Sequence, residues 1–129
     1  MPTKPIIVQT VASTFTTYVQ KVEVYDTVLD KLRTKHPREY EKLPEIYKTI
    51  EGNATHIHRS KTHDSSIVMV NQSLCDPNGD PLRIPVKVFD DGTGIMSSAY
   101  FSAASDHGEM LWSEDDGPIV PEFKGRKRK

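Results

Sequence analysis

The second half of the chain consists of short strand-like segments separated by turn-forming residues. Two connectors are rich in such residues, Asp76–Pro81 and Asp90–Gly94, and Asp91-Gly92 in the second is typical of a hairpin. Connectors this short join antiparallel neighbours, because a parallel pair needs a long crossover. The sequence therefore predicts a four-stranded antiparallel meander. Its strands are expected at Thr55–Ser60, Ser66–Leu74, Leu82–Asp90 and Ile95–Ala103.

Two apolar stripes at helical spacing precede these strands. Pro37 separates the stripes, because it disfavours helical geometry at His36 and suits the first turn of a new helix. Pro44 lies inside the second stripe and is expected either to kink that helix or to start its main part. The stripes consist of Val28, Leu29 and Leu32 after a capping Asp26 or Thr27, and of Tyr40, Leu43, Ile46, Tyr47 and Ile50 before Gly52.

Together these elements predict an α+β fold. Two helices, or three, are expected on one face of the four-stranded antiparallel sheet, and the other face is expected to stay available. Residues 1–24 are expected to form an N-terminal arm that is either a strand or a helix, and residues 25–104 the α+β domain. Residues 105–129 are acidic and then basic, and are expected to form a flexible tail.

Composition narrows the class of protein. No apolar run approaches the roughly 20 residues that cross a bilayer, and the N-terminus has no signal-peptide pattern. Cys75 is the only cysteine, which excludes an internal disulfide and fits a reducing compartment. The sequence therefore predicts a cytoplasmic protein without a membrane partner. The net charge of −1 provides no bulk basic field for nucleic acid, although residues 124–129 are strongly basic.

Alternation along the strands predicts which side chains share the open face. In the third strand the apolar Ile84, Val86 and Val88 are expected to meet the helices, so Lys87 is expected on the opposite face. Alternation along the first and last strands works in the same way. It gathers Lys87, His56, His58, Met96, Ser98 and Tyr100 on the open face, with His36 expected to reach in from the joint between the helices.

These side-chain types are the ones that metal-free phosphate chemistry requires. A histidine with a pKa near neutrality takes and returns protons, and a lysine stabilises a phosphoryl oxygen as charge builds on it. Hydroxyl groups fix the phosphate by hydrogen bonds. The pattern thus predicts a phosphate-handling site that uses no metal and no cofactor.

The chain resembles small nucleases of the Barnase–EndoU–Colicin–RelE group, especially the phage-associated and polymorphic-toxin branches. The resemblance spans about Asp26 to Ala103, and rests on Lys35-His36-Pro37 between two apolar helices and on Ser98-Ala99-Tyr100 in the last strand. It implies two helices followed by a four-stranded antiparallel sheet. It also implies metal-independent cleavage of RNA that leaves a 2′,3′-cyclic phosphate.

The resemblance further implies roles for individual residues. His36 would be the general acid or base, Lys87 would stabilise the transition state, and Ser98 and Tyr100 would position the phosphate. The implied partners are an RNA substrate and a cognate inhibitor protein. His58 or Arg59, on the first strand, would complete the charge work. Strand alternation and the basic chain end separately predict substrate contacts from Arg59, His56, Lys127 and Arg128.

Two alternatives remain open. His56 and His58 share one strand face, and with His63 and Asp64 in the following loop they offer a set of zinc ligands. A sheet that carries Tyr100 and Phe89, together with a basic tail, also fits a non-catalytic module of phage or mobile-element origin. Such a module would bind RNA by stacking and charge, or would bind a partner protein.

Overall fold

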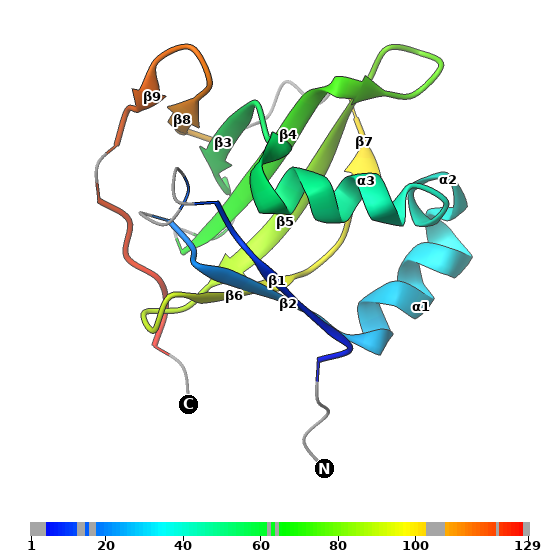
Figure 1. Ribbon diagram of the computed structural model, residues 1–129, viewed down its shortest axis with the longest axis horizontal. Helices are drawn as coiled ribbons and strands as arrows, with labels where there is room; N and C mark the ends of the chain where they lie inside the picture. Colours follow the sequence, from blue (N-terminus) through cyan, green and yellow to red (C-terminus); the bar gives the residue numbers. More distant parts are fainter. Residues whose placement is uncertain are drawn as a thin grey trace.

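The computed structural model describes residues 5–12, 15, 18–61, 63, 65–102, 108–120 and 122–127. One twisted sheet dominates it, and the helices lie across one face of that sheet (Figure 1). The helices are α1 (Asp26–Lys35), α2 (Pro37–Tyr40), α3 (Leu43–Lys48) and the π-helix η2 (Thr49–Asn53). The strands are β1 (Ile7–Thr10), β2 (Lys21–Val24), β3 (His56–Arg59), β4 (Ser66–Cys75), β5 (Pro81–Val88), β6 (Thr93–Met96), β7 (Tyr100–Phe101), β8 (Met110–Ser113) and β9 (Gly117–Pro118).

The sheet is mixed and has nine strands, in the order β1-β2-β6-β5-β4-β3-β8-β9, with β7 paired to β5. The prediction of two or three helices on a four-stranded antiparallel sheet is therefore wrong. Strands β3 to β6 lie at or near the predicted segments and follow one another as antiparallel neighbours. The hairpin β1–β2 joins this meander through parallel pairing of β2 with β6, and β8–β9 extend it beyond β3.

Proline residues divide the helical region into short pieces. Pro37 is the first residue of α2, and Pro44 lies in the first turn of α3. Each proline thus starts a helix, where its missing N–H costs nothing. None of the α-helices within the described part of the chain is long and apolar enough to cross a bilayer.

The core lies between these helices and the sheet. Leu32, Ile46 and Ile50 come from the helical layer and are fully buried. Opposite them, Ile84, Val86 and Val88 are buried on β5, as the alternation predicts, and Ile67 and Met69 of β4 extend the same apolar surface. Lys87 is exposed, so it faces away from the helices.

A β-bulge lies between β6 and β7. Val86 pairs with Met96 and Arg83 pairs with Tyr100, so three steps along β5 correspond to four steps along the other strand. One extra residue reverses the alternation. The prediction that Met96 and Tyr100 share the open face is therefore wrong. Met96 is 1% exposed on the helix side with Val86, whereas Tyr100 lies on the face of Arg83.

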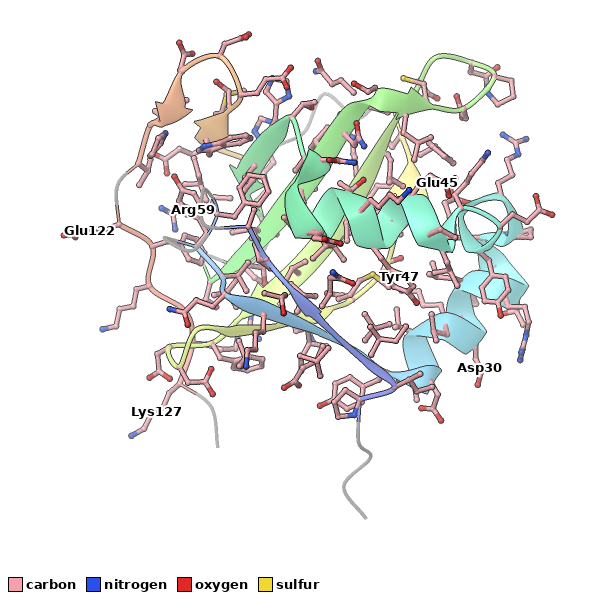
Figure 2. All side chains as sticks on the ribbon, in the orientation of Figure 1. Asp30, Glu45, Tyr47, Arg59, Glu122 and Lys127 are labelled. Carbon is pink, nitrogen blue, oxygen red and sulfur yellow. The ribbon has the colours of Figure 1, made fainter. Side chains whose placement is uncertain are left out.

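The region beyond residue 105 contributes to the sheet and the core. β8 pairs with β3, and Leu111 and Trp112 are buried. The Trp112 ring packs edge-on against Phe15, with ring centroids 4.8 Å apart. Residues 122–127, called the C-terminal segment below, then return along the lower end of the sheet (Figure 1). The Glu122 and Lys127 side chains point outward from it (Figure 2).

Candidate phosphate-binding site

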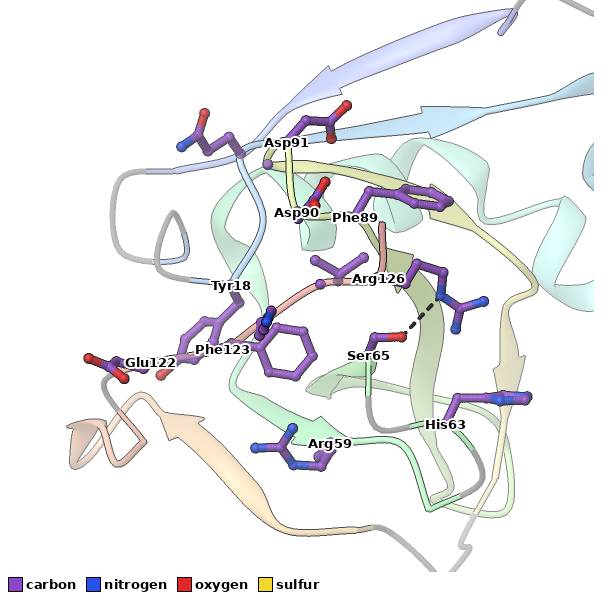
Figure 3. Close-up of a pocket in the computed structure, with 15 residues that line it drawn as sticks. Tyr18, Arg59, His63, Ser65, Phe89, Asp90, Asp91, Glu122, Phe123 and Arg126 are labelled. Carbon is purple, nitrogen blue, oxygen red and sulfur yellow. Dashed lines mark hydrogen bonds between the residues drawn. The ribbon is translucent and has the colours of Figure 1, made fainter. Parts of the chain in front are cut away.

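A cavity of about 1230 Å³ lies at the end of the sheet where β5 passes into the turn before β6 (Figure 3). Its walls come from the end of β3, the β3–β4 loop, the β5–β6 turn, residues just before β2 and the C-terminal segment. The charged residues that line it are Arg59, His63, Lys124, Arg126, Asp90, Asp91 and Glu122.

The C-terminal segment docks on β5 through backbone hydrogen bonds. The Arg126 N–H donates to the Val88 carbonyl at 2.9 Å, and the Asp90 N–H donates to the Arg126 carbonyl at 2.9 Å. This pairs Arg126 with Phe89 as a parallel bridge. The approach requires glycine at position 125, because a Cβ there would overlap the backbone of Phe89.

Aromatic and polar contacts hold the rest of the C-terminal segment and the residues that lead into it. The Tyr18 hydroxyl lies 2.7 Å from the Leu111 carbonyl and 2.9 Å from the Val120 carbonyl. Burial raises the pKa of Tyr18, so this hydroxyl stays protonated as a donor. The Arg59 guanidinium lies 5.1 Å from the centre of the Phe123 ring and forms an ion pair with Glu109 at 3.1 Å.

The Arg126 side chain is held by two hydroxyl groups. Its Nε donates to Ser65 Oγ at 3.0 Å, and its Nη2 donates to Ser66 Oγ at 3.2 Å. A guanidinium has five N–H donors, so others remain for a ligand. The ion pairs of the described residues involve Arg33, Arg38 and Arg59, and Arg126 takes part in none of them.

Lys87 lies on the same face as this guanidinium. It is directly opposite Ser66 in the β4–β5 pairing, and opposite residues have their Cβ atoms about 5 Å apart. The Lys87 side chain is exposed and, within the described ranges, takes part in neither a hydrogen bond nor an ion pair. Neither cation forms an ion pair with a described carboxylate, so the two repel each other, and an anion between them removes the repulsion. The arrangement suits a phosphate group.

A half-buried aromatic ring completes this part of the surface. Phe89 is two residues beyond Lys87, and so lies on the same face. Its partner in the bridge is Arg126, so the ring lies beside Lys87 along the strand and beside Arg126 across it. His63 is exposed, and lies in Figure 3 on the same side of the cavity as Arg126 and Ser65.

The structure separates several residues that the sequence gathers into one site. His36 is half-buried at the joint of α1 and α2, at the opposite side of the molecule in Figure 1 from the end of β5 that carries Lys87. Ser98 is 8% exposed, in the bulge between β6 and β7. Tyr100 pairs with Arg83, four residues from Lys87, which is about 13 Å along a strand.

The two strand histidines are not at the Arg126 guanidinium either. His56 is half-buried, His58 is 5% exposed, and their rings stack with centroids 6.3 Å apart. His58 pairs with Val68, so it shares the Lys87 face but is buried in it. In the part of the chain that is described, no three metal-ligating side chains come together. Asp64, a member of the zinc alternative, lies outside that part.

The remaining predicted substrate-binding residues, one on β3 and two at the chain end, have different outcomes. Arg59 lines the cavity but is occupied with Glu109 and Phe123. Lys127 is exposed beside Arg126, and Arg128 lies outside the described residues. Sequence reasoning missed Arg126 with its partners Ser65 and Ser66. The signal that remains visible in the sequence is Gly125 within a run of basic residues, because glycine permits a close backbone approach.

Comparisons with known protein families, with curated proteins and with solved structures find no match for this chain.

Proposed function

We propose that the protein binds single-stranded RNA, with one phosphate at Arg126 and Lys87 and a base stacked on Phe89. Proteins that bind single strands combine cations that follow the backbone with aromatic rings on which bases stack. The surface at the end of β5 has both kinds of group within one or two residues of each other. The proposal places the protein in the cytoplasm, in agreement with its single cysteine.

One observation supports the proposal above the others. The Arg126 guanidinium is fixed by two serine hydroxyls rather than by a carboxylate, and its neighbour Lys87 is exposed. A guanidinium oriented in this way loses little side-chain entropy when it binds a phosphate, and keeps its full positive charge for that ligand.

Replacing Lys87 with glutamine tests the proposal. We expect K87Q to lower the affinity for a fluorescein-labelled single-stranded RNA of about 12 nucleotides by about 5- to 10-fold, because one phosphate contact is lost. The slope of the logarithm of the binding constant against the logarithm of the salt concentration should also become shallower by about one, the contribution of one phosphate contact. Fluorescence anisotropy at about 50 and 200 mM salt measures both quantities. The matched control is Lys48→Gln, an exposed lysine at the end of α3 in the helical layer.

Equal affinities of K87Q and the wild type would contradict the proposal. A Lys48→Gln variant that weakens binding as much as K87Q would also contradict it, since the effect would then reflect overall charge. Lys87 is exposed, so neither variant is expected to change the free energy of unfolding by more than about 0.5 kcal/mol. Single-stranded DNA of the same sequence shows whether the 2′-hydroxyl contributes.

Metal-independent cleavage of RNA at the same site is a second candidate function, and the position of His63 favours it. This imidazole is exposed and lines the cavity on the side of Arg126, so it can transfer a proton to or from a bound phosphodiester. Incubation of RNA with the protein in EDTA, followed by analysis of the ends, tests this function. New 2′,3′-cyclic phosphate ends that are absent with His63→Gln would support cleavage. Intact RNA would refute cleavage, and RNA binding would remain as the proposed function.

A further inference from the structure

Four residues form a row across the sheet at the proposed RNA site. Lys21 of β2 pairs with Thr93 of β6, and the Phe89 N–H donates to the Thr93 carbonyl at 2.8 Å. Phe89 in turn is bridged to Arg126. The row therefore runs Lys21, Thr93, Phe89, Arg126, over four neighbouring strands or segments.

The side chains of this row point to one face. Val22 and Val24 are fully buried on the helix side of β2. Lys21 precedes Val22 in the strand and therefore faces the other side, as Phe89 does. Lys21 is exposed, and among the residues that the structure describes it has no ion pair and donates no side-chain hydrogen bond. It is a free cation on the face that carries Lys87 and Arg126.

The spacing of the row separates its two ends. Three strand-to-strand steps place the Cα atoms of Lys21 and Arg126 about 14 Å apart. The Arg126 guanidinium also turns toward Ser65 and Ser66, away from β6 and β2. The ammonium group and the guanidinium therefore cannot easily meet on a single phosphate, and the Phe89 ring stands between them.

We propose that Lys21 forms a second phosphate subsite, so that the ligand is an oligonucleotide that crosses β6 and β5 with a base on Phe89. This inference rests on the proposed RNA binding, and adds to it the minimum size of the ligand and the direction in which it crosses the sheet. Each end of the row binds a different phosphate of the same strand. Thr93, between the two, donates its hydroxyl to Asp91 Oδ1 at 2.6 Å, so the phosphate contacts at the two ends of the row come from Lys21 and Arg126.

The test compares Lys21→Gln with the wild type on two probes, a single-stranded RNA of about 12 nucleotides and the mononucleotide uridine 3′-monophosphate. We expect K21Q to weaken RNA binding by about 3- to 10-fold, and to change mononucleotide binding by less than about twofold. Anisotropy measures the first quantity and calorimetric titration the second. Lys48→Gln is the control, and circular dichroism confirms that each variant is folded.

The outcomes distinguish this inference from the function on which it rests. If K21Q binds the RNA as tightly as the wild type while K87Q binds it weakly, the second subsite is refuted and RNA binding stands. If K21Q weakens both probes equally, Lys21 belongs to the first phosphate site and the inference is also refuted. If the wild type binds neither probe, the proposed function fails and the second subsite fails with it.

Discussion

Gly125→Val is expected to release the C-terminal segment from β5 and to remove most of the affinity for RNA. A Cβ at position 125 would lie 2.8 Å from the Phe89 Cα and still closer to the Phe89 carbonyl group, which is backbone and cannot move aside. Overpacking of this kind costs about 1–3 kcal/mol. Detachment of the segment relieves the clash, and carries Arg126 away from Ser65 and Ser66.

Proteolysis and RNA affinity both report on the detachment of the C-terminal segment. Trypsin should cut at Lys124, Arg126 and Lys127 at least about 10-fold faster in G125V than in the wild type, because cleavage requires the segment to open. RNA affinity should fall by about 10-fold or more, since the guanidinium no longer meets the phosphate.

Gly79→Ala is the matched control for the change at position 125. Gly79 has φ of +86° and nothing within 4 Å of the site of a Cβ, so alanine strains the turn by about 1 kcal/mol without touching the site. G79A should bind RNA as the wild type does. A G125V protein with the proteolysis rate and RNA affinity of the wild type would show that the segment does not dock as described.

Trp112→Ala is expected to lower the free energy of unfolding by about 3–5 kcal/mol, the range for deleting a buried aromatic side chain. Trp112 is 8% exposed and packs edge-on against Phe15, on a strand that pairs with β3. Losing the indole therefore opens a cavity in the core and also removes an aromatic pair.

Urea denaturation followed by circular dichroism measures this loss. Trp112→Phe should retain more than half of the free energy of unfolding that Trp112→Ala loses, because a phenyl ring still fills much of the space. Trp112 is the only tryptophan, so its fluorescence reports on this position alone in the wild-type protein. A loss below about 1 kcal/mol for W112A, or wild-type emission typical of tryptophan in water, would show that β8 is not part of the core.

The central meander could be predicted because its signals are local. Turn-forming residues mark the ends of its strands, and the apolar trio on β5 identifies its buried face. The added strands have no such signals. β2 has four residues, and it pairs with β6 about seventy positions further along the chain, a contact that leaves no local pattern. The bulge after Met96 is likewise set by tertiary packing.

The core of the candidate site was predictable at Lys87 and Phe89. Alternation within one strand assigns the face that both share, and this assignment needs no knowledge of other elements. The prediction for His36 requires that the joint between α1 and α2 reach the open face, and the joint lies at the other side of the molecule (Figure 1). Arg126 was assigned to a flexible tail, since nothing in a run of basic residues indicates that it bridges to Phe89.

An NMR titration of ¹⁵N-labelled protein with unlabelled single-stranded RNA tests the RNA site most directly. We expect the largest amide shifts at Ser66, Lys87, Phe89 and Arg126, with further shifts at Lys21 from the second subsite. Shifts confined to His36 and its neighbours on α1 and α2, or no shifts at saturating RNA, would contradict a phosphate site at the end of β5.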